Sequence, residues 1–151
     1  MDRRSAHLKF GIMGEKYAVK KLCELGYDAE RASRTDYDIL ISGRMRVEVK
    51  SSTLSHGIGN RWLWQFCLRR NGLPFDEDLL IALCYSRLDL DPNHAFIIPG
   101  TVIGNQLTKI SITKTDPVEY AGKWRWFLDY WDQVGIVLPG CPELEEEVIP
   151  F

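Results

Sequence analysis

Two short runs rich in β-branched residues, 38–41 and 45–50, stand on either side of Gly43. Such runs around a short glycine-containing connection predict a β-hairpin with a tight turn. A three-residue loop centred on Gly43 would place Asp38 opposite Glu48, because both residues lie five positions from that glycine. The hairpin limits the possible fold more than any other part of the sequence, and it brings two carboxylates together.

Side-chain alternation places the ammonium group of Lys50 near these carboxylates. Successive side chains of a strand point to opposite faces, so Glu48 and Lys50 share a face. Magnesium prefers oxygen ligands and commonly takes only one or two protein carboxylates. Asp38 and Glu48 fit that role, while Lys50 would orient an attacking water or stabilise charge developing on phosphorus. An E-x-K run on a strand is usually a solvated strand face, but with Asp38 opposite Glu48 these residues have the chemistry needed for metal-dependent hydrolysis of a phosphodiester.

Apolar periodicity predicts one long helix and several strands around the hairpin. Apolar residues recur at helical intervals from His7 to Leu25, most firmly from Gly14 onward, and Gly26 follows as a stop. Five further strands are expected at residues 27–32, 62–69, 79–85, 95–98 and 109–113. The run 79–85 is nearly all apolar, which favours an interior strand, and 109–113 is expected at an edge. The mixture of elements indicates an α/β (α+β) fold.

The last part of the chain is expected to hold one more helix and a loose end. This helix would begin near Asp116, where an N-cap, a first-turn proline and a capping-box acid occur together. Four large apolar side chains then recur at helical intervals and are expected in the core: Trp124, Phe127, Leu128 and Trp131. Residues 135–151 lack periodicity and predict a loosely attached acidic tail. We expect one domain over residues 1–151, with its core at about 8–133.

The composition excludes other kinds of site. The chain has 151 residues, of which 45% are hydrophobic and 26% charged, as in ordinary globular proteins. Its four cysteines form no C-x-x-C pair and its three histidines are scattered, so zinc is not expected and the cysteines are interpreted as reduced core thiols. No apolar run is long enough to cross a bilayer, so we expect a cytoplasmic protein without membrane association. Any metal must be held by oxygen.

The charge is divided unevenly along the chain. The net charge is −2, but residues 1–72 hold 14 basic and 8 acidic residues, a balance of +6. Residues 73–151 hold 5 basic and 13 acidic residues, a balance of −8. A site in the first half would favour a polyanion. A solvated surface with uneven charge is the ordinary alternative explanation.

These residues, taken together, carry a resemblance to a known family. Gly14-Glu15-Lys16-Tyr17-Ala18 in the expected helix, Asp38 before a β run, and Glu48-Val49-Lys50 at the end of the partner strand resemble the PD-(D/E)XK nuclease superfamily. This superfamily includes restriction enzymes, junction resolvases and some homing endonucleases. The resemblance covers roughly residues 8 to 100.

The resemblance implies a fold and a set of roles. The fold would be a restriction endonuclease-like core, with a mixed central sheet flanked by helices. Asp38 and Glu48 would bind Mg²⁺, with Mn²⁺ as a substitute, Lys50 would assist the water, and Glu15 would reach the same metal or its surroundings. Tyr37 stands where the family pattern has proline, and Asp36 competes for the role of Asp38.

Other polar residues are secondary candidates for contact with substrate. Gln65 stands among aromatic neighbours and would touch a metal-bound water or a phosphate, although a solvent-facing glutamine is the commoner case. Ser51 and Ser52 are further candidates for phosphate contact. Five arginines are candidates for contact with the nucleic-acid backbone, and surface solvation explains any one of them equally well: Arg31, Arg34, Arg61, Arg69 and Arg70.

The sequence thus predicts a metal-dependent DNA endonuclease, either site-specific in the homing or restriction-like manner or a Holliday junction resolvase-like enzyme. The alternative from another class is a catalytically inactive DNA-binding module of the same fold. Cutting both strands of a duplex with one small domain is most simply done by a two-fold assembly, so a homodimer or higher homo-oligomer is expected.

Overall fold

A computed structural model describes residues 3–32, 37–56, 62–68, 74–104, 109–114 and 123–144. The first sheet has five strands: β1 (Ala29–Arg31), β2 (Ile39–Ile41), β3 (Met45–Thr53), β6 (Leu79–Tyr85) and β7 (His94–Pro99). The second sheet has three strands: β4 (Ser55–His56), β5 (Trp62–Cys67) and β8 (Lys109–Lys114). The helical elements are α1 (Arg3–Glu24), α2 (Gly100–Ile103), α3 (Gln133–Val137), and the 3-10 helices η2 (Lys123–Phe127) and η3 (Leu138–Gly140).

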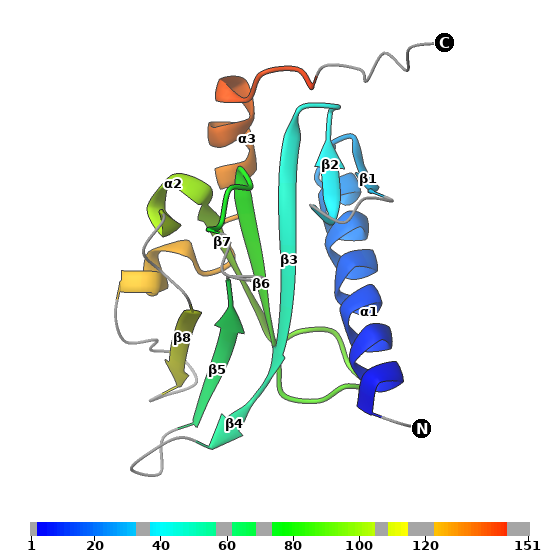
Figure 1. Ribbon diagram of the computed structural model, residues 1–151, viewed down its shortest axis with the longest axis vertical. Helices are drawn as coiled ribbons and strands as arrows, with labels where there is room; N and C mark the ends of the chain where they lie inside the picture. The colour runs from blue at the N-terminus through cyan, green and yellow to red at the C-terminus, as the bar shows by residue number, and fades with distance from the viewer. Residues whose placement is uncertain are drawn as a thin grey trace.

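The central sheet is mixed, as expected. Its strand order is β1-β2-β3-β6-β7, in which β3 and β6 run parallel and the other neighbours antiparallel. The interior strand β6 is buried along its whole length, which agrees with its apolar sequence. The strand β8 lies at an edge of the second sheet, also as expected. Residues of α1 and α3 pack on one face of the central sheet, and residues of α2 and η2 pack on the other. Figure 1 shows α1 running along β1, β2 and β3, and α3 near one end of the sheet.

The hairpin of β2 and β3 has the predicted register. Ile39 pairs with Val47 and Ile41 with Met45. Gly43 has a φ of 66° in the connecting turn, which the Arg44 N–H closes by donating to the Ile41 carbonyl oxygen at 3.0 Å. This left-handed backbone conformation is one that glycine adopts without steric cost.

The helix α1 begins well before Gly14, the point from which the sequence most firmly predicts it. It ends at Glu24, two residues before the predicted stop at Gly26. Gly26 has a φ of 94°, and its N–H donates to the Cys23 carbonyl oxygen at 3.0 Å. The Tyr27 N–H donates to the Leu22 carbonyl oxygen at 3.0 Å, which completes a Schellman end. None of the described helices combines the length and the apolar character needed to cross a bilayer.

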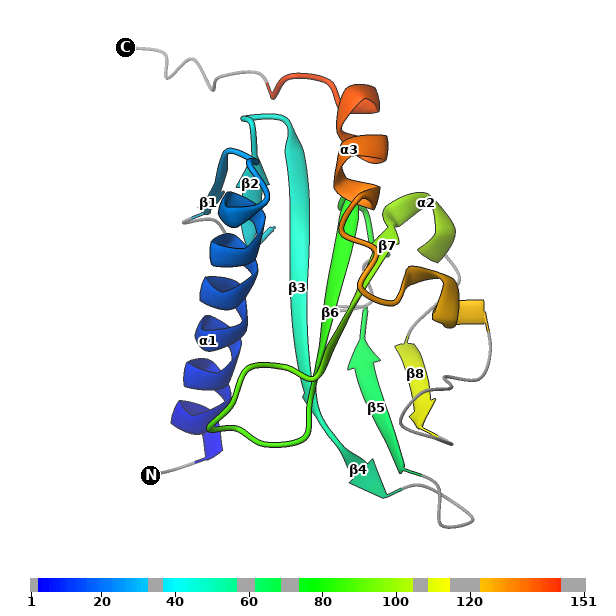
Figure 2. The ribbon, with the colours of Figure 1, turned by 180° about the vertical axis from the view of Figure 1, so that it is seen from behind.

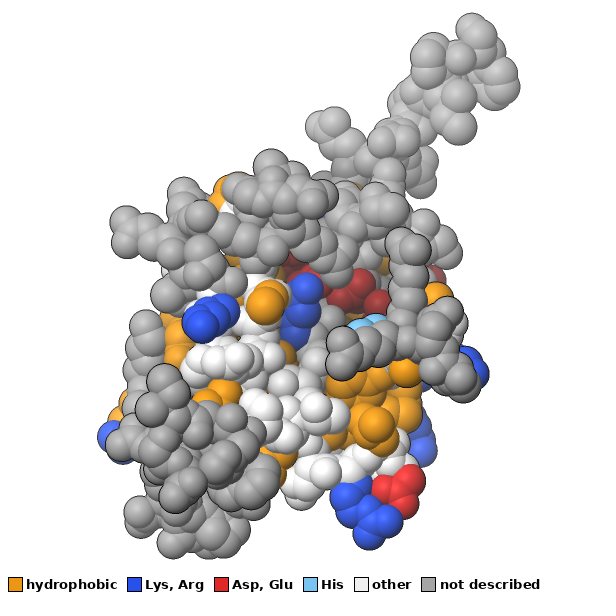
Figure 3. All heavy atoms as spheres, turned by 60° about the horizontal axis from the view of Figure 1, so that its bottom comes forward, with side chains coloured by type: hydrophobic (Ala, Val, Ile, Leu, Met, Phe, Trp, Pro, Cys, Tyr) orange, Lys and Arg blue, Asp and Glu red, His pale blue; other side chains and the backbone are white. Residues whose placement is uncertain are grey.

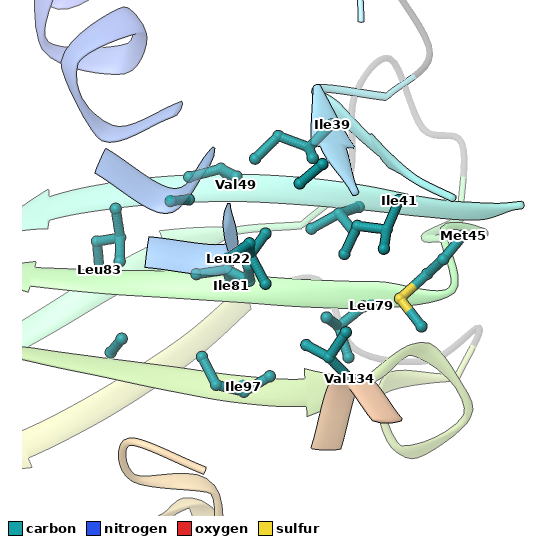
Figure 4. Close-up of a cluster of buried hydrophobic side chains, with 14 of the residues drawn as sticks. Leu22, Ile39, Ile41, Met45, Val49, Leu79, Ile81, Leu83, Ile97 and Val134 are labelled. Carbon is teal, nitrogen blue, oxygen red and sulfur yellow. The ribbon is translucent and has the colours of Figure 1, made fainter. Parts of the chain in front are cut away.

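Two apolar clusters lie on opposite faces of the central sheet. The first joins α1 to the sheet through Leu22, Ile39, Val49 and their neighbours (Figure 4). The second fills the space toward β5 and β8, with Trp64 and Phe66 among its largest side chains. The alternation of buried Trp64 and Phe66 with exposed Gln65 confirms the strand periodicity of this segment.

The last part of the chain differs from the expected continuous helix. Residues 123–131 form the short η2 and then a turn, and Asp129 has a φ of 49°. The Asp129 N–H donates to the Ala95 carbonyl oxygen and its Oδ1 accepts from the Ala95 N–H, so Asp129 is held against β7. These bonds end the helix before Trp131. The expected start near Asp116 lies outside the described residues.

The segment after residue 135 is also better packed than expected as far as it is described. It forms the end of α3 and then η3, followed by Cys141, which is only 4% exposed. Arg44 in the hairpin donates to the carbonyl oxygens of Pro139 and Cys141, at 3.3 Å and 2.6 Å from Nη2. The hairpin residue Arg44 therefore connects this segment to the sheet, and residues 135–141 pack on the domain. Figure 2 shows the chain passing from α3 over the end of the β2–β3 hairpin. Residues 145–151 lie outside the described part.

The cysteines only partly follow the expectation of core thiols. All of them are free. Cys84 and Cys141 are buried, whereas Cys23 and Cys67 are exposed. Cys67 is exposed because it lies on the outward face of β5, on the same side as Gln65.

Candidate active site

Asp38 remains bound to β3 at the point where β2 begins. Its N–H donates to the Val47 carbonyl oxygen at 2.9 Å, and its Oδ2 accepts a hydrogen bond from the Val49 N–H at 2.8 Å. Since these bonds lie on either side of Glu48 along β3, Asp38 sits across the hairpin from Glu48. The bond to Val49 also fixes the Asp38 carboxylate at the edge of β3, where β2 no longer covers it.

Glu48 and Lys50 project from the same face of β3, as alternation predicts. Glu48 is buried, with 3% exposure, and its Oε1 lies 3.2 Å from the Lys50 Nζ. A carboxylate removed from water needs a compensating charge or hydrogen bonds, and the ammonium supplies one such interaction. The pair thus keeps an ammonium group beside a buried carboxylate.

The helix α1 contributes Glu15 to the same region. Burial raises the pKa of Glu15, and a hydrogen bond with Asp38 and the charge of Asp38 raise it further. Two carboxyl groups in hydrogen-bonding contact repel each other when both are ionised. Glu15 and Asp38 therefore form a close acidic pair between the helix and the sheet.

Arg31 at the end of β1 opposes the rise in the pKa of Glu15. Its Nη2 and Nε lie 2.9 Å and 3.2 Å from the Glu15 Oε2, so both nitrogens donate to one oxygen. The guanidinium lowers the pKa of Glu15, while burial and Asp38 raise it, and the net shift is upward. Arg31 was a candidate for contact with DNA, and the structure engages it with Glu15. No sequence pattern indicates this pair, because its members lie 16 positions apart on different elements.

The position of α1 depends on Gly14, the residue before Glu15. A methyl group on the Gly14 Cα would overlap the Ser51 Oγ and would lie 3.3 Å from the Leu83 Cδ1. The absence of a side chain at Gly14 thus lets the helix approach β3 closely. This approach sets the reach of Glu15 toward the hairpin.

The donor atoms of the candidate residues have the chemistry that a hard divalent cation requires. Glu15, Asp38 and Glu48 offer only oxygen donors, which are the ligands that Mg²⁺ takes. The close Glu15–Asp38 pair is a site where a cation would relieve repulsion. Among the described residues, no group of three or more His, Cys, Asp or Glu side chains is arranged to hold a metal ion. The structure brings Glu15 to Asp38 and pairs Glu48 with Lys50. Two carboxylates, such as Glu15 and Asp38, are a common protein contribution to a magnesium site.

The secondary candidates Gln65 and Ser52 also lie together. The Gln65 N–H donates to the Ser52 Oγ at 3.3 Å, which joins β5 to the end of β3 two residues beyond Lys50. Gln65 is exposed, which agrees with the expectation that a glutamine at such a position usually faces solvent. Ser51 points to the opposite face, where its buried Oγ lies next to Gly14 of α1. Ser52, and not Ser51, is therefore on the face of Glu48 and Lys50.

The other expected positions are divided between described and undescribed residues. Arg34, Arg61, Arg69 and Arg70 lie outside the described residues, as does Asp36, the competitor of Asp38. Figure 3 shows the face that comes forward when the lower end of Figure 1 is tilted toward the viewer. On this face, recessed acidic side chains lie next to Lys or Arg side chains. Acidic and basic side chains therefore lie side by side on this face.

Comparison with known proteins identifies the fold. No family model matches the chain, and no curated protein matches it. Among solved structures, the bacterial homing endonuclease I-Ssp6803I matches with a TM-score of 0.64, over 86% of this chain and 91% of that protein, at 16% sequence identity. The two chains therefore share a fold, a mixed central sheet flanked by helices.

Proposed function

We propose that this chain is a Mg²⁺-dependent endonuclease of the PD-(D/E)XK type, which hydrolyses phosphodiester bonds in DNA. The observation that carries the proposal is the grouping of Asp38, Glu48 and Lys50 at one end of the β2–β3 hairpin, with Glu15 against Asp38. The fold shared with a bacterial homing endonuclease supports it at the level of architecture.

In this proposal, Asp38 and Glu48 would be the metal ligands, and Glu15 would reach the same ion or its surroundings. Bound Mg²⁺, or Mn²⁺ in its place, would polarise the phosphate and lower the pKa of a coordinated water. The Val49 N–H orients the Asp38 carboxylate through the bond to Oδ2. A ligand held in this way requires little rearrangement when it binds a cation.

Lys50 acts on the water or on the phosphate. Its Nζ lies 3.2 Å from the Glu48 Oε1, so the ammonium is held next to a proposed metal ligand. From this position it donates a hydrogen bond to the attacking water or to a phosphate oxygen whose negative charge grows during attack. Its contribution is therefore larger in the transition state than in the ground state.

The proposed substrate is double-stranded DNA, cut at specific sites in the homing or restriction-like manner. The balance of +6 over residues 1–72, which include all four proposed catalytic residues, supports a polyanionic substrate. We place the activity in the cytoplasm, because free thiols at all four cysteines fit a reducing compartment.

A substrate panel tests this function. Long genomic DNA, plasmid, four-way junctions, single-stranded DNA and RNA are incubated with wild-type protein or the Asp38→Ala variant, in Mg²⁺, Mn²⁺ or EDTA. We expect metal-dependent cuts at discrete sites in double-stranded DNA by the wild type alone. Cleavage confined to junctions would identify a resolvase, and binding without cleavage in either metal would identify an inactive module. A protein that binds none of these nucleic acids contradicts the proposal.

We propose that the working form is a homodimer or higher homo-oligomer, because a symmetry axis supplies a second site for the second DNA strand. Light scattering should then give a multiple of the 17.4 kDa chain mass. When wild type is mixed with excess Lys50→Ala protein, nicked circles should replace linear plasmid. A monomeric mass together with unchanged linear products would contradict this part of the proposal.

A further inference from the structure

The ion pair of Arg31 and Glu15 differs from an ordinary surface pair. Two of the three guanidinium nitrogens, Nε and Nη2, contact one carboxylate oxygen. The Glu15 side chain is only 19% exposed, while that of Arg31 is 41% exposed. Asp38 also interacts with Glu15 and raises its pKa. Arg31 thus lies beside a pair of acids, and not beside a single solvated carboxylate.

When both acids are ionised, a nearby cation stabilises the pair in the metal-free protein. Two ionised carboxylates in contact and partly removed from water destabilise the folded state. Arg31 is always charged and has a fixed planar set of donors, so it can offset this repulsion at any pH at which the protein is folded. Because Nε and Nη2 both donate to Glu15, the ion pair with Glu15 is the main contact of Arg31 among the described residues.

We infer that Arg31 is the resident counter-ion of the Glu15–Asp38 pair, and that it competes with the divalent cation for this site. The inference rests on the proposed function, since that function places the cation there. It assigns Arg31 to the control of metal affinity, whereas a role in phosphate contact would assign it to DNA affinity. Arg31 is in this sense a positioning residue that acts through Glu15.

The two roles predict changes in different affinities when Arg31 is removed: the affinity for the metal ion in the counter-ion role, and the affinity for DNA in the phosphate-contact role. A cation bound to Glu15 would lie within a few ångströms of the guanidinium, and the repulsion between them weakens metal binding. Loss of the guanidinium therefore strengthens metal binding in the absence of DNA. It also leaves two carboxylates without their cation, so the metal-free protein becomes less stable.

Calorimetric titration of Mn²⁺ into DNA-free protein measures the first effect. The titration compares wild type, Arg31→Ala and Arg87→Ala at pH 8 and low ionic strength. Arg87 is a matched control, because it donates to both carboxylate oxygens of Asp89 in an exposed pair, and its removal changes the net charge equally. We expect the Mn²⁺ affinity to rise roughly tenfold for Arg31→Ala and to change little for Arg87→Ala.

Thermal unfolding measures the second effect on the same proteins. Without metal, Arg31→Ala should melt at a lower temperature than Arg87→Ala. Saturating Mn²⁺ should raise the melting temperature of Arg31→Ala by more than it raises that of wild type, because tighter binding to the folded state stabilises it further. Arg31→Gln, which keeps a hydrogen-bond donor but not the charge, serves if the alanine variant does not fold.

The outcomes separate this inference from the proposed function. Unchanged or weaker Mn²⁺ binding by Arg31→Ala, or an equal gain by Arg87→Ala, overturns the inference alone, provided that wild type binds Mn²⁺ and cuts DNA. If wild-type protein does not bind Mn²⁺, the proposed metal site is wrong and the inference falls with it. A fall in DNA affinity in EDTA, without a change in Mn²⁺ affinity, would return Arg31 to the phosphate-binding role.

Discussion

Gly14 of α1 packs so closely on Ser51 of β3 that a methyl group on the glycine would overlap the serine Oγ. This contact sets the distance between the helix that carries Glu15 and the strand that carries Glu48 and Lys50. Packing of the fold and geometry of the candidate site are therefore coupled at one residue.

Replacement of Gly14 by alanine should lower both the stability of the fold and the activity of the candidate site. The methyl group must displace Ser51 or the helix, and overpacking of this kind costs about 1 to 3 kcal/mol of unfolding free energy. Urea unfolding measures this loss, and cleavage assays should show reduced activity because Glu15 moves. Gly11→Ala is the control, since an added Cβ there meets nothing within 4 Å. It should stabilise the helix by about 0.5 to 1 kcal/mol, and equal losses in both variants would contradict the packing argument.

Much of the fold was predictable because its strands have simple periodicity. The run 79–85 predicted an interior strand and became β6 with the same bounds, buried throughout. The end of the long helix at Gly26 was also predictable, because a left-handed residue at that point favours glycine. These features depend on local sequence alone.

The last part of the chain was not predictable in this way. The apolar spacing of Trp124 and its neighbours favours a helix, but Asp129 makes backbone and side-chain hydrogen bonds to Ala95, 34 positions earlier. These tertiary bonds stabilise a turn that helix propensity opposes. Arg44 likewise fixes the segment around Cys141 across 97 positions of sequence.

The same distinction applies to the candidate site. Asp38, Glu48 and Lys50 belong to one hairpin, so the spacing around Gly43 was enough to predict which of them face one another. The contact between Arg31 and Glu15 joins an edge strand to a helix, and only the packing of α1 on the sheet creates it. Sequence reasoning therefore found the groups on the hairpin and missed the pairing with Arg31.

Arg44→Ala should reduce stability by removing the link between the hairpin and the segment after α3. Arg44 donates from Nε and Nη2 to the Cys141 carbonyl oxygen, at 2.9 Å and 2.6 Å. Loss of charged donors from partly buried carbonyl groups costs about 1 to 3 kcal/mol, measurable by urea unfolding. Arg87→Ala, at an exposed ion pair, should cost less than about 1 kcal/mol. A loss no larger than that of Arg87→Ala would show that the segment contributes little.

DNA binding should depend steeply on salt. Each phosphate that a Lys or Arg neutralises releases counterions, so log affinity should fall with log salt by about 0.9 per contact. Filter binding in Ca²⁺ or EDTA, over a range of salt concentrations, gives this slope. Removal of both Arg69 and Arg70 should lower the slope by about 2 if each contacts a phosphate, whereas Arg87→Ala should leave it unchanged. A slope near zero for wild type would exclude binding through the DNA backbone.

Lys50→Ala should abolish cleavage while leaving DNA binding nearly intact. The ammonium acts on charge that develops in the transition state, so its loss lowers the rate of the chemical step more than it lowers affinity. Single-turnover cleavage and filter binding measure the two effects separately. Because Glu48 is buried beside Lys50, the variant should also unfold more easily, and circular dichroism must show that it remains folded at the assay temperature.

Comparison with Asp38→Ala separates the role of the lysine from that of the metal ligands. Loss of a carboxylate weakens binding of the ion, so high Mn²⁺ should restore part of the Asp38→Ala activity, whereas no metal concentration replaces the Lys50 ammonium. Mn²⁺ titration calorimetry should accordingly show weaker binding for Asp38→Ala and retained binding for Lys50→Ala. If Lys50→Ala, purified free of contaminating nuclease, cuts DNA at the wild-type rate, then Lys50 does not act on the reacting groups and the mechanism proposed for this site is wrong.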